Sequence, residues 1–309
     1  MALVFYSDSD RFEPWRDALN AAIPDLEVRN WDQAGDPAEI DFALVWLPPQ
    51  GALRRFPNLK AILNLGAGVD ALLKDPTLPK GVPIVRMVDD DLAKCMAEYV
   101  LLHVLRYHRD QPLLDAQQRR KEWRIVASPA AQHRRVGVMG LGAMGGEAAR
   151  HLLAVGFDVA SWTRSPRPMP GVEGFHGAGG LGPFLARTEI LVCLLPLTRE
   201  TQGILDRDLL DRLPRGACLI NAGRGGHQVE ADILQALDAG QLAGATLDVF
   251  RTEPLPVDSP LWTHPKVTVT PHNASITNPA SAVRHVVESI RRARAGEPLV
   301  NIVDPEVGY

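Results

Sequence analysis

The sequence has few cysteines and no apolar stretch long enough to cross a membrane. Its three cysteines show no metal or redox spacing, and Cys193 and Cys218 lie in apolar runs that predict buried strands. We interpret all three as reduced packing thiols of a cytoplasmic protein. The longest apolar run, Ile190–Leu195, has six residues, whereas a membrane-spanning helix needs about 20. Near the start of the sequence no basic segment precedes an apolar core, so we expect no secretory signal.

The sequence also lacks an excess of positive charge. Lys and Arg number 33 against 37 Asp and Glu, and the formal net charge of −4 argues against a dedicated nucleic-acid partner. Hydrophobic residues make up 46% and charged residues 23%, which are the proportions of a globular protein rather than a disordered or fibrous one. A chain of 309 residues is long for one hydrophobic core and suits two lobes. We assign no metal site.

Short apolar runs alternate with amphipathic stretches of helical length, which predicts an α/β fold with parallel sheets. The first series has expected strands at 3–6, 26–31, 43–47 and 61–65, and expected helices at 11–22 and 92–109. The second series has expected strands at 136–139, 158–162, 190–194, 218–221, 245–249 and 267–270. The polar segment 111–135 separates the two series, and we interpret it as a connecting arm on the surface.

A glycine-rich loop follows the expected strand at 136–139. It has the pattern G-x-G-x-x-G and precedes a helix of small residues that ends at Gly156. In such loops the first glycine allows a tight turn, the second lets the backbone approach a pyrophosphate, and the third lets the helix pack closely on the strand. The N–H groups at the start of the helix then face the phosphates. The pattern predicts a dinucleotide site formed by Gly140, Leu141, Gly142, Ala143, Met144 and Gly145.

The end of the next strand predicts which dinucleotide binds. NAD enzymes usually place an acidic residue there, but Asp158 opens the strand and lies roughly 16 Å from its end, at about 3.3 Å per residue. We therefore interpret Asp158 as structural. The strand end offers hydroxyls and guanidinium groups suited to a 2′-phosphate: Thr163, Arg164, Ser165 and Arg167. They predict a preference for NADP(H), with NAD(H) as the alternative if both arginines point into solvent.

Three polar residues follow later strands, at positions where open α/β sheets place their ligands. Arg224 lies in the segment 219–226, Glu253 in 247–255 and His272 in 269–275. Each has a structural alternative when taken alone: a solvated loop arginine, a surface glutamate, or one histidine among nine.

Together, and in this order after the glycine loop, Arg224, Glu253 and His272 resemble the pattern of the D-isomer-specific 2-hydroxyacid dehydrogenases. The resemblance covers essentially the whole chain, and Leu65–Asp70 is similar to that family's substrate carboxylate loop. Gly223 departs from the pattern, because many relatives carry Ala there, and is expected to loosen the Arg224 loop without removing a functional group. More narrowly, the chain resembles the glyoxylate/hydroxypyruvate reductase A group in Ala43–Trp46 with Pro48-Pro49, Ser161–Arg164, Glu253–Pro256 and Gly308-Tyr309.

The resemblance implies two Rossmann-like doubly wound lobes with parallel sheets and the active site in the inter-lobe cleft. Residues 1–97 and 281–309 would form the substrate-binding lobe, and residues 98–280 the dinucleotide-binding lobe. It also implies a homodimer built on the dinucleotide-binding lobes, the helix at 92–109 and the arm at 111–135.

The resemblance further implies how a small 2-keto acid, glyoxylate or hydroxypyruvate, is reduced with NAD(P)H. Arg224 would bridge the carboxylate and the ketone oxygen. His272 would be the general acid in reduction and the general base in oxidation, and Glu253 would orient its ring and favour its protonated form. Asp248 would accept a hydrogen bond from the nicotinamide carboxamide. Further cofactor contacts are implied for Leu195, Pro196, Asn221, Ala222, Gly223, His272, Ala274 and Ser275.

Substrate size is expected to depend on the first lobe. Backbone N–H groups of the Ala67, Gly68 and Val69 loop would hold the carboxylate. Trp46 would face the same region and leave room for two or three carbons, unless it is a core residue packed behind its strand.

Two other functions stay open at this stage. The chain could be a dehydrogenase of another D-2-hydroxy acid that uses NAD. It could also be a nucleotide-sensing binding protein on the same fold, although the complete Arg224, Glu253 and His272 set argues against that.

Overall fold

The computed structural model describes residues 1–305, and the chain divides into two compact units. Unit 1 comprises Met1–Leu92 and Thr277–Tyr309, and unit 2 comprises Ala93–Ile276. The divisions fall at Leu92 and Thr277, a few residues before the expected boundaries at 97 and 281. The resemblance to Gly308-Tyr309 lies outside the described residues.

Unit 1 is a five-stranded parallel sheet in the order β2-β1-β3-β4-β5. This order is that of a doubly wound sheet of the flavodoxin type. Its core lies where buried strand residues such as Val4, Ala43 and Ile62 meet the surrounding helices and loops. Its elements are β1 (Ala2–Tyr6), α1 (Phe12–Ala22), β2 (Glu27–Asn30), β3 (Ile40–Val45), β4 (Ala61–Asn64), α2 (Asp70–Leu73), β5 (Ile84–Val85) and α9 (Pro279–Ala295).

The two chain segments of unit 1 are joined at Asp89. Its buried carboxylate accepts hydrogen bonds from Ser281 Oγ and Arg284 Nη2, both at 2.8 Å, and helix α9 packs against α1. Burial alone would raise the pKa of Asp89, but the hydrogen bonds from Ser281 and Arg284 and the charge of Arg284 hold the pKa below its ordinary value. Asp89 therefore stays ionised at neutral pH and ties helix α9 to the N-terminal segment.

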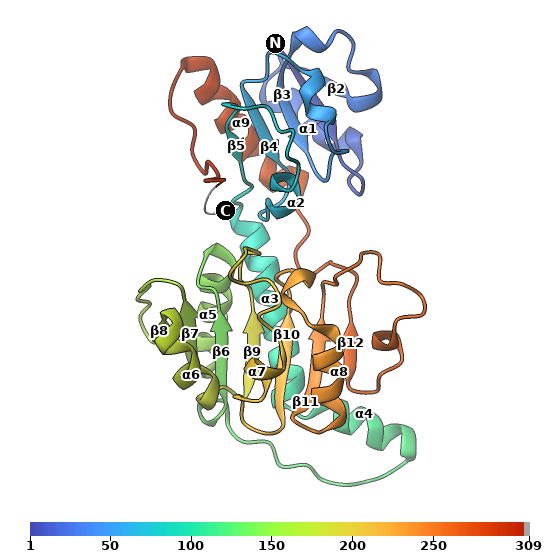
Figure 1. Cartoon of the computed structure of the whole chain (residues 1–309), viewed down its shortest axis with the longest axis vertical. Helices are drawn as coiled ribbons and strands as arrows, with labels where there is room; N and C mark the ends of the chain where they lie inside the picture. The colour runs from blue at the N-terminus through green and yellow to red at the C-terminus, as the bar shows by residue number, and fades with distance from the viewer. Residues whose placement is uncertain (306–309) are drawn as a thin grey trace. The chain divides into compact units, whose positions relative to one another are not determined.

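Unit 2 is a seven-stranded parallel sheet in the order β12-β11-β10-β9-β6-β7-β8 (Figure 1). The order reverses between β6 and β9, and ligands of open α/β sheets bind outside the carboxyl ends of the strands at such a switch point. Its strands are β6 (Arg135–Met139), β7 (Asp158–Thr163), β8 (Glu173–His176), β9 (Ile190–Cys193), β10 (Ala217–Asn221), β11 (Leu242–Leu247) and β12 (Val267–Val269). Its helices are α3 (Asp90–His108), which begins just before the unit boundary, α4 (Gln111–Arg120), α5 (Ala143–Val155), α6 (Gly177–Arg187), α7 (Arg207–Leu210) and α8 (Glu230–Asp238).

Alternate residues of the central strands of unit 2 enter two separate cores. In β9, Ile190 and Val192 pack in the core that α3 and α5 cover, while Leu191 and Cys193 pack in the core of α6, α7 and α8. Both faces of the sheet are thus covered, which explains why this strand is apolar throughout. The expected α/β class with two doubly wound parallel sheets is confirmed.

The sequence-based elements differ from the structure mainly at polar segments. The expected arm at 111–135 begins with a helix, α4, before it continues as an irregular segment to β6 (Figure 1). The edge strand β8 was not predicted, because Glu173–His176 is largely exposed and lacks an apolar run. The strand predicted at 43–47 ends at Val45, since Leu47 adopts a positive φ of 48°.

All three cysteines are free thiols, but Cys95 is exposed, so the expectation that all three are packing residues is wrong for Cys95. Cys193 and Cys218 lie in the strands expected for them, and burial raises the pKa of both thiols to about 12. They therefore act as packing residues rather than reactive thiols. Within residues 1–305, no helix is both long and apolar enough to span a membrane.

Candidate active site

The glycine loop joins β6 to α5 at the switch point of the unit 2 sheet. Gly140 has a φ of +92°, and its N–H donates to the carbonyl of Trp162 at the end of β7. A Cβ on Gly145 would lie 1.9 Å from the carbonyl oxygen of Gly140, so only glycine lets the helix approach this closely. A Cβ on Gly142 would meet nothing within 4 Å, and no side chain caps the start of α5. The loop therefore leaves open space in front of the helix N-terminus, which fits a pyrophosphate.

The end of β7 lies next to this loop. Arg167 Nη1 donates to the carbonyl of Leu141 at 3.0 Å, which links the segment after β7 to the glycine loop. Thr163 Oγ1 donates to the carbonyl of Ser165 at 2.8 Å and holds the intervening turn. Arg164, Ser165 and Arg167 are all exposed. Although Arg167 is exposed, its guanidinium is thus held against the glycine loop.

Asp158 lies at the opposite end of β7. Its carboxylate forms an ion pair with Arg187 at 2.6 Å, and Arg187 also pairs with Glu173 at 3.1 Å. Asp158 therefore links β7 to α6, and it is a structural residue as expected from its position in the strand.

The turn after β10 carries Arg224. The buried side chain of Asn221, the last residue of β10, accepts a hydrogen bond from Gly223 N–H and donates to the carbonyl of Arg224, both at 3.1 Å. A Cβ on Gly225 would lie 1.9 Å from the carbonyl group of Phe250, so this turn touches the segment after β11 directly. The Arg224 guanidinium folds back on this turn, where Nη1 donates to the carbonyl of Gly223 at 2.8 Å, and the turn lies beside the segment that leads to Glu253.

Glu253 and His272 form a hydrogen-bonded pair. His272 Nδ1–H donates to Glu253 Oε2 at 2.7 Å, and Phe250 N–H donates to Glu253 Oε1 at 2.8 Å. Burial alone would raise the pKa of Glu253, but the His272 and Phe250 hydrogen bonds and the charge of Arg224 hold it below its ordinary value. Glu253 is thus ionised at neutral pH. Because it occupies Nδ1, the other nitrogen of His272, Nε2, is left to exchange a proton.

Asp248 holds the loop that carries His272. Its buried carboxylate accepts hydrogen bonds from Thr270 Oγ1 at 2.6 Å and from the N–H groups of Asn273 and Ala274 at 3.0 Å. His272 itself has a left-handed φ of 52°, a conformation that these bonds support. The structure therefore gives Asp248 a role in shaping the loop. Its contact with a nicotinamide carboxamide stays a prediction.

Several residues predicted to bind the cofactor have side chains directed into the protein. Leu195, Ala222 and Ala274 are buried apolar residues, and the amide of Asn221 is engaged in its own turn. Contacts of these residues with a dinucleotide would be made by backbone groups, and they remain predictions. The carbonyl of Pro196 accepts hydrogen bonds from within the protein, and Ser275 follows the loop that Asp248 braces.

In unit 1, the expected carboxylate loop follows β4. The buried amide of Asn64 donates to the carbonyls of Gly66 and Gly68 at 2.7 and 3.0 Å and sets the conformation of the loop. Trp46 is half-buried, and a Cβ on Gly66 would lie 2.3 Å from its indole ring. The indole therefore packs directly on the loop, rather than behind the strand as the alternative interpretation required.

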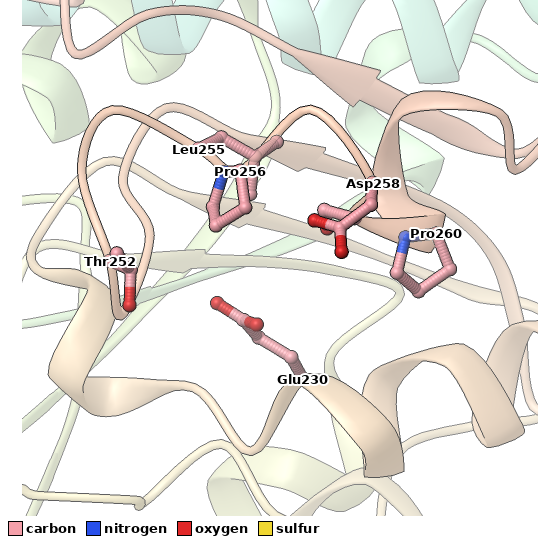
Figure 2. Close-up of a pocket in the computed structure, with 7 residues that line it drawn as sticks. Glu230, Thr252, Leu255, Pro256, Asp258 and Pro260 are labelled. Atoms are coloured by element: carbon pink, nitrogen blue, oxygen red, sulfur yellow. The ribbon is translucent and has the colours of Figure 1, made fainter.

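A pocket of about 240 Å³ lies beside the segment that follows Glu253 (Figure 2). The carboxylates of Glu230 and Asp258 point into it, with Thr252 at its rim (Figure 2). Two carboxylates repel an anion, so this pocket does not suit the keto acid that the sequence led us to expect. Within residues 1–305, no group of three or more His, Cys, Asp or Glu side chains is arranged to hold a metal ion.

Sequence reasoning missed the buried polar residues that support this site. His227 and Gln228 lie fully buried behind Arg224, and Tyr99 of α3 is hydrogen-bonded to Thr270 at 2.7 Å. His227 and Gln228 follow a double glycine directly after Arg224, and this polar pair was the signal available in the sequence. Tyr99 lies 171 positions from Thr270, and nothing in the sequence pairs them.

The chain belongs to the D-isomer specific 2-hydroxyacid dehydrogenase family. Residues 101–274 match the sequence model of the NAD-binding domain of that family. This match confirms the resemblance that Arg224, Glu253 and His272 suggested.

Individual relatives are more specific. A glyoxylate/hydroxypyruvate reductase A from Serratia proteamaculans is 44% identical, with both chains covered completely. A D-isomer specific 2-hydroxyacid dehydrogenase from Xanthobacter autotrophicus, solved in complex with NADPH and MES, is 50% identical with a TM-score of 0.96, covering 100% of this chain and 99% of its own. An NADPH-dependent glyoxylate/hydroxypyruvate reductase from Sinorhizobium meliloti, in complex with NADP and sulfate, is 42% identical with a TM-score of 0.94 and the same coverage.

Proposed function

We propose that this protein reduces small 2-keto acids, glyoxylate and hydroxypyruvate, to 2-hydroxy acids with NADPH. The observation that carries the proposal is the hydrogen-bonded pair of His272 and Glu253, placed beside the Arg224 turn at the carboxyl ends of the unit 2 strands. Relatives that cover the whole chain bear the name glyoxylate/hydroxypyruvate reductase A, which supports the same substrates here.

The residues of unit 2 fit a nicotinamide dinucleotide. The open space at Gly142 and the uncapped start of α5 suit its pyrophosphate. Thr163, Arg164, Ser165 and Arg167 surround the strand end where its ribose would lie, with no carboxylate among them. When bound, the nicotinamide supplies the hydride that the keto carbon receives.

The residues of this chain supply the remaining chemistry. Arg224 binds the substrate carboxylate and polarises the ketone with its planar fork of donors. His272 transfers a proton from Nε2 to the ketone oxygen while Nδ1 stays bound to Glu253. The carboxylate of Glu253, which is ionised at neutral pH, keeps the ring oriented through this hydrogen bond. In the reverse direction His272 accepts the proton.

Unit 1 supplies selectivity for size in this proposal. Its loop of Ala67, Gly68 and Val69 binds the substrate carboxylate through N–H groups, and the indole of Trp46 lies on the same loop at Gly66. We therefore expect Trp46→Ala to raise kcat/KM for phenylpyruvate relative to glyoxylate, because it removes a bulky wall. If the ratio of the two kcat/KM values stays unchanged in a folded variant, Trp46 does not set substrate size.

A homodimer is part of the proposal. Five exposed apolar side chains lie on α3, α4 and the segment that follows: Leu102, Leu113, Leu114, Trp123 and Ile125. Trp123 is 99% exposed, and an apolar region of this kind is typical of an interface. Light scattering on the purified protein tests this, and a monomer at micromolar concentration would contradict it. The cytoplasmic location remains a prediction from the sequence.

The decisive assay measures loss of nicotinamide absorbance with glyoxylate, hydroxypyruvate, pyruvate and phenylpyruvate as substrates. We expect glyoxylate and hydroxypyruvate to be reduced most efficiently. Efficient turnover of a different keto acid would instead favour a dehydrogenase of another 2-hydroxy acid. No turnover of any of the four would favour a nucleotide-sensing binding protein.

A further inference from the structure

The buried residue His227 contacts three parts of the site at once. It ends the short helical turn Gly225–His227 that follows Arg224, and it is 0% exposed. Arg224 N–H donates to His227 Nδ1 at 3.1 Å, and His227 Nε2 lies 3.3 Å from the carbonyl oxygen of Pro196. Cys193 Sγ, at the end of β9, is 3.8 Å from Nδ1.

These partners fix the hydrogen positions on the ring. A backbone N–H can only donate, so Nδ1 accepts the hydrogen bond from Arg224. A carbonyl can only accept, so Nε2 carries the hydrogen that points to Pro196. Both ring nitrogens are therefore engaged in the neutral tautomer with the hydrogen on Nε2. A residue bound in this way is not available to exchange protons with a substrate.

The ring also fills the space in front of Gly223. A Cβ there would lie 3.1 Å from both Cε1 and Nδ1 of His227, and 3.2 Å from the carbonyl oxygen of Leu195. Gly223 thus lets the ring and the Leu195–Pro196 backbone pack tightly on the Arg224 turn. This corrects the expectation that glycine at this position loosens the turn.

We propose that His227 is a positioning residue that ties the Arg224 turn to the Leu195–Pro196 loop. Its Nδ1 holds the backbone at the base of the Arg224 side chain, and its Nε2–H holds the Pro196 carbonyl. His227 therefore keeps two elements in one fixed geometry. One is the guanidinium that binds the keto acid, and the other is the loop at the end of β9 beside the nucleotide site. The inference rests on the proposed function, because that function gives Arg224 to the substrate and this loop to the cofactor.

Two conservative variants separate the two hydrogen bonds. Asn places an amide oxygen near the position of Nδ1, so His227→Asn keeps an acceptor for Arg224 N–H but loses the bond to Pro196. Gln reaches the position of Nε2, so His227→Gln keeps a donor for Pro196 but leaves Arg224 N–H without its acceptor. His227→Leu removes both bonds. His108→Leu is the matched control, since His108 is also buried in unit 2 but packs against Phe157.

The variants are compared by thermal unfolding and by kcat and KM for NADPH with saturating glyoxylate. We expect His227→Gln to lower kcat about tenfold with KM for NADPH within twofold of wild type, because a buried N–H has lost its acceptor. His227→Asn should instead raise KM for NADPH severalfold and keep kcat within about threefold. His227→Leu should show both effects. His108→Leu should lower the unfolding temperature and leave both constants within twofold.

The proposal is overturned if His227→Asn and His227→Gln change the same constant, or if all His227 variants lose only thermal stability. Should His227→Leu fail to fold, the other two variants carry the test.

Wild-type turnover of glyoxylate is measured in the same series, and its absence would refute the proposed function but not the positioning role. In that case the dissociation constants of NADPH and of oxalate replace the kinetic constants. Weaker NADPH binding in His227→Asn and weaker oxalate binding in His227→Gln would then support the role, and equal changes would refute it.

Discussion

The turns after β4 in unit 1 and after β10 in unit 2 are built in the same way and carry different groups. Each begins with a buried asparagine at the end of a central strand, and that asparagine folds back to bind the backbone of a glycine-containing turn. The unit 1 turn presents backbone groups beside the indole of Trp46. The unit 2 turn presents Arg224, with His227 locked behind it.

The difference shows how one structural device serves two purposes. The amide of an asparagine at the end of a strand shapes a turn without adding charge. The unit 1 turn is therefore neutral, and in the proposed function it binds the substrate carboxylate through its N–H groups. A turn that carries a guanidinium needs more support, because its backbone sets where the charge lies. In unit 2 this support comes from His227, whose two ring nitrogens bind the N–H of Arg224 and the carbonyl of Pro196. In the proposed function, the turn with the additional hydrogen bonds is the one that carries the guanidinium for the substrate.

The largest effect is expected at His272, the histidine that is hydrogen-bonded to Glu253. His272→Asn should fold and bind NADPH but lose about 10²–10⁴-fold in kcat, since a positioned general acid is worth that much. Steady-state reduction of glyoxylate and a separate NADPH titration measure the two properties. A loss below tenfold would place the chemistry elsewhere.

The next effect tests the charged end of β7. Arg164→Ala should raise KM for NADPH at least about tenfold and leave KM for NADH nearly unchanged, because one charge-assisted hydrogen bond is worth about 1.5–3 kcal/mol. Arg187→Ala, which removes an arginine of α6 paired with Asp158 and Glu173, is the control for lost positive charge. Equal increases in both KM values would exclude a contact between Arg164 and the 2′-phosphate.

The two strand-ending asparagines test the comparison itself. Asn221→Ala removes three hydrogen bonds of the unit 2 turn, at 2.9–3.1 Å, and should lower kcat and thermal stability together. Asn64→Ala removes two bonds of the unit 1 turn and should raise KM for glyoxylate severalfold with kcat near wild type. Each buried group left without a partner costs about 1–3 kcal/mol. If both variants change the same constant, either KM for glyoxylate or kcat, the two turns do not differ in role.

The smallest change concerns the pH profile. Glu253 has a lowered pKa, so at neutral pH it is a carboxylate that accepts the Nδ1–H of His272 and orients the ring. Glu253→Gln replaces the carboxylate with a neutral amide and should lower kcat at neutral pH. The two enzymes should become more alike as the pH falls through the lowered pKa of Glu253, because the wild-type carboxyl group then takes up a proton and loses its charge. A ratio of the two kcat values that stays constant with pH would exclude Glu253 from this role.

The sequence predicted those parts of the fold and site that depend on local patterns. The apolar strands β6, β9 and β10 and the glycine loop follow from runs and spacing, and Arg224, Glu253 and His272 follow from their positions after strands. The edge strand β8 and helix α4 were missed, because neither carries a continuous apolar pattern.

The hydrogen bonds that support the site could not be predicted, since they join elements that are distant in the sequence. Asp248 accepts hydrogen bonds from residues 22–26 positions away, and Tyr99 reaches Thr270 from helix α3. His227 was hidden for another reason. A histidine in a polar loop suggests an exposed side chain, yet its ring is fully buried, and the two glycines before it let the turn pack closely on Phe250 and Leu197.

The most direct test of the account is the ratio of kcat/KM for NADPH to that for NADH, measured on the wild-type enzyme with glyoxylate as substrate. Two charge-assisted contacts to the 2′-phosphate should favour NADPH by about 100-fold or more, at about 1.4 kcal/mol per decade. Clear reduction of glyoxylate with such a ratio is the predicted result. Equal use of the two cofactors, or no reduction of glyoxylate with either, would contradict the account.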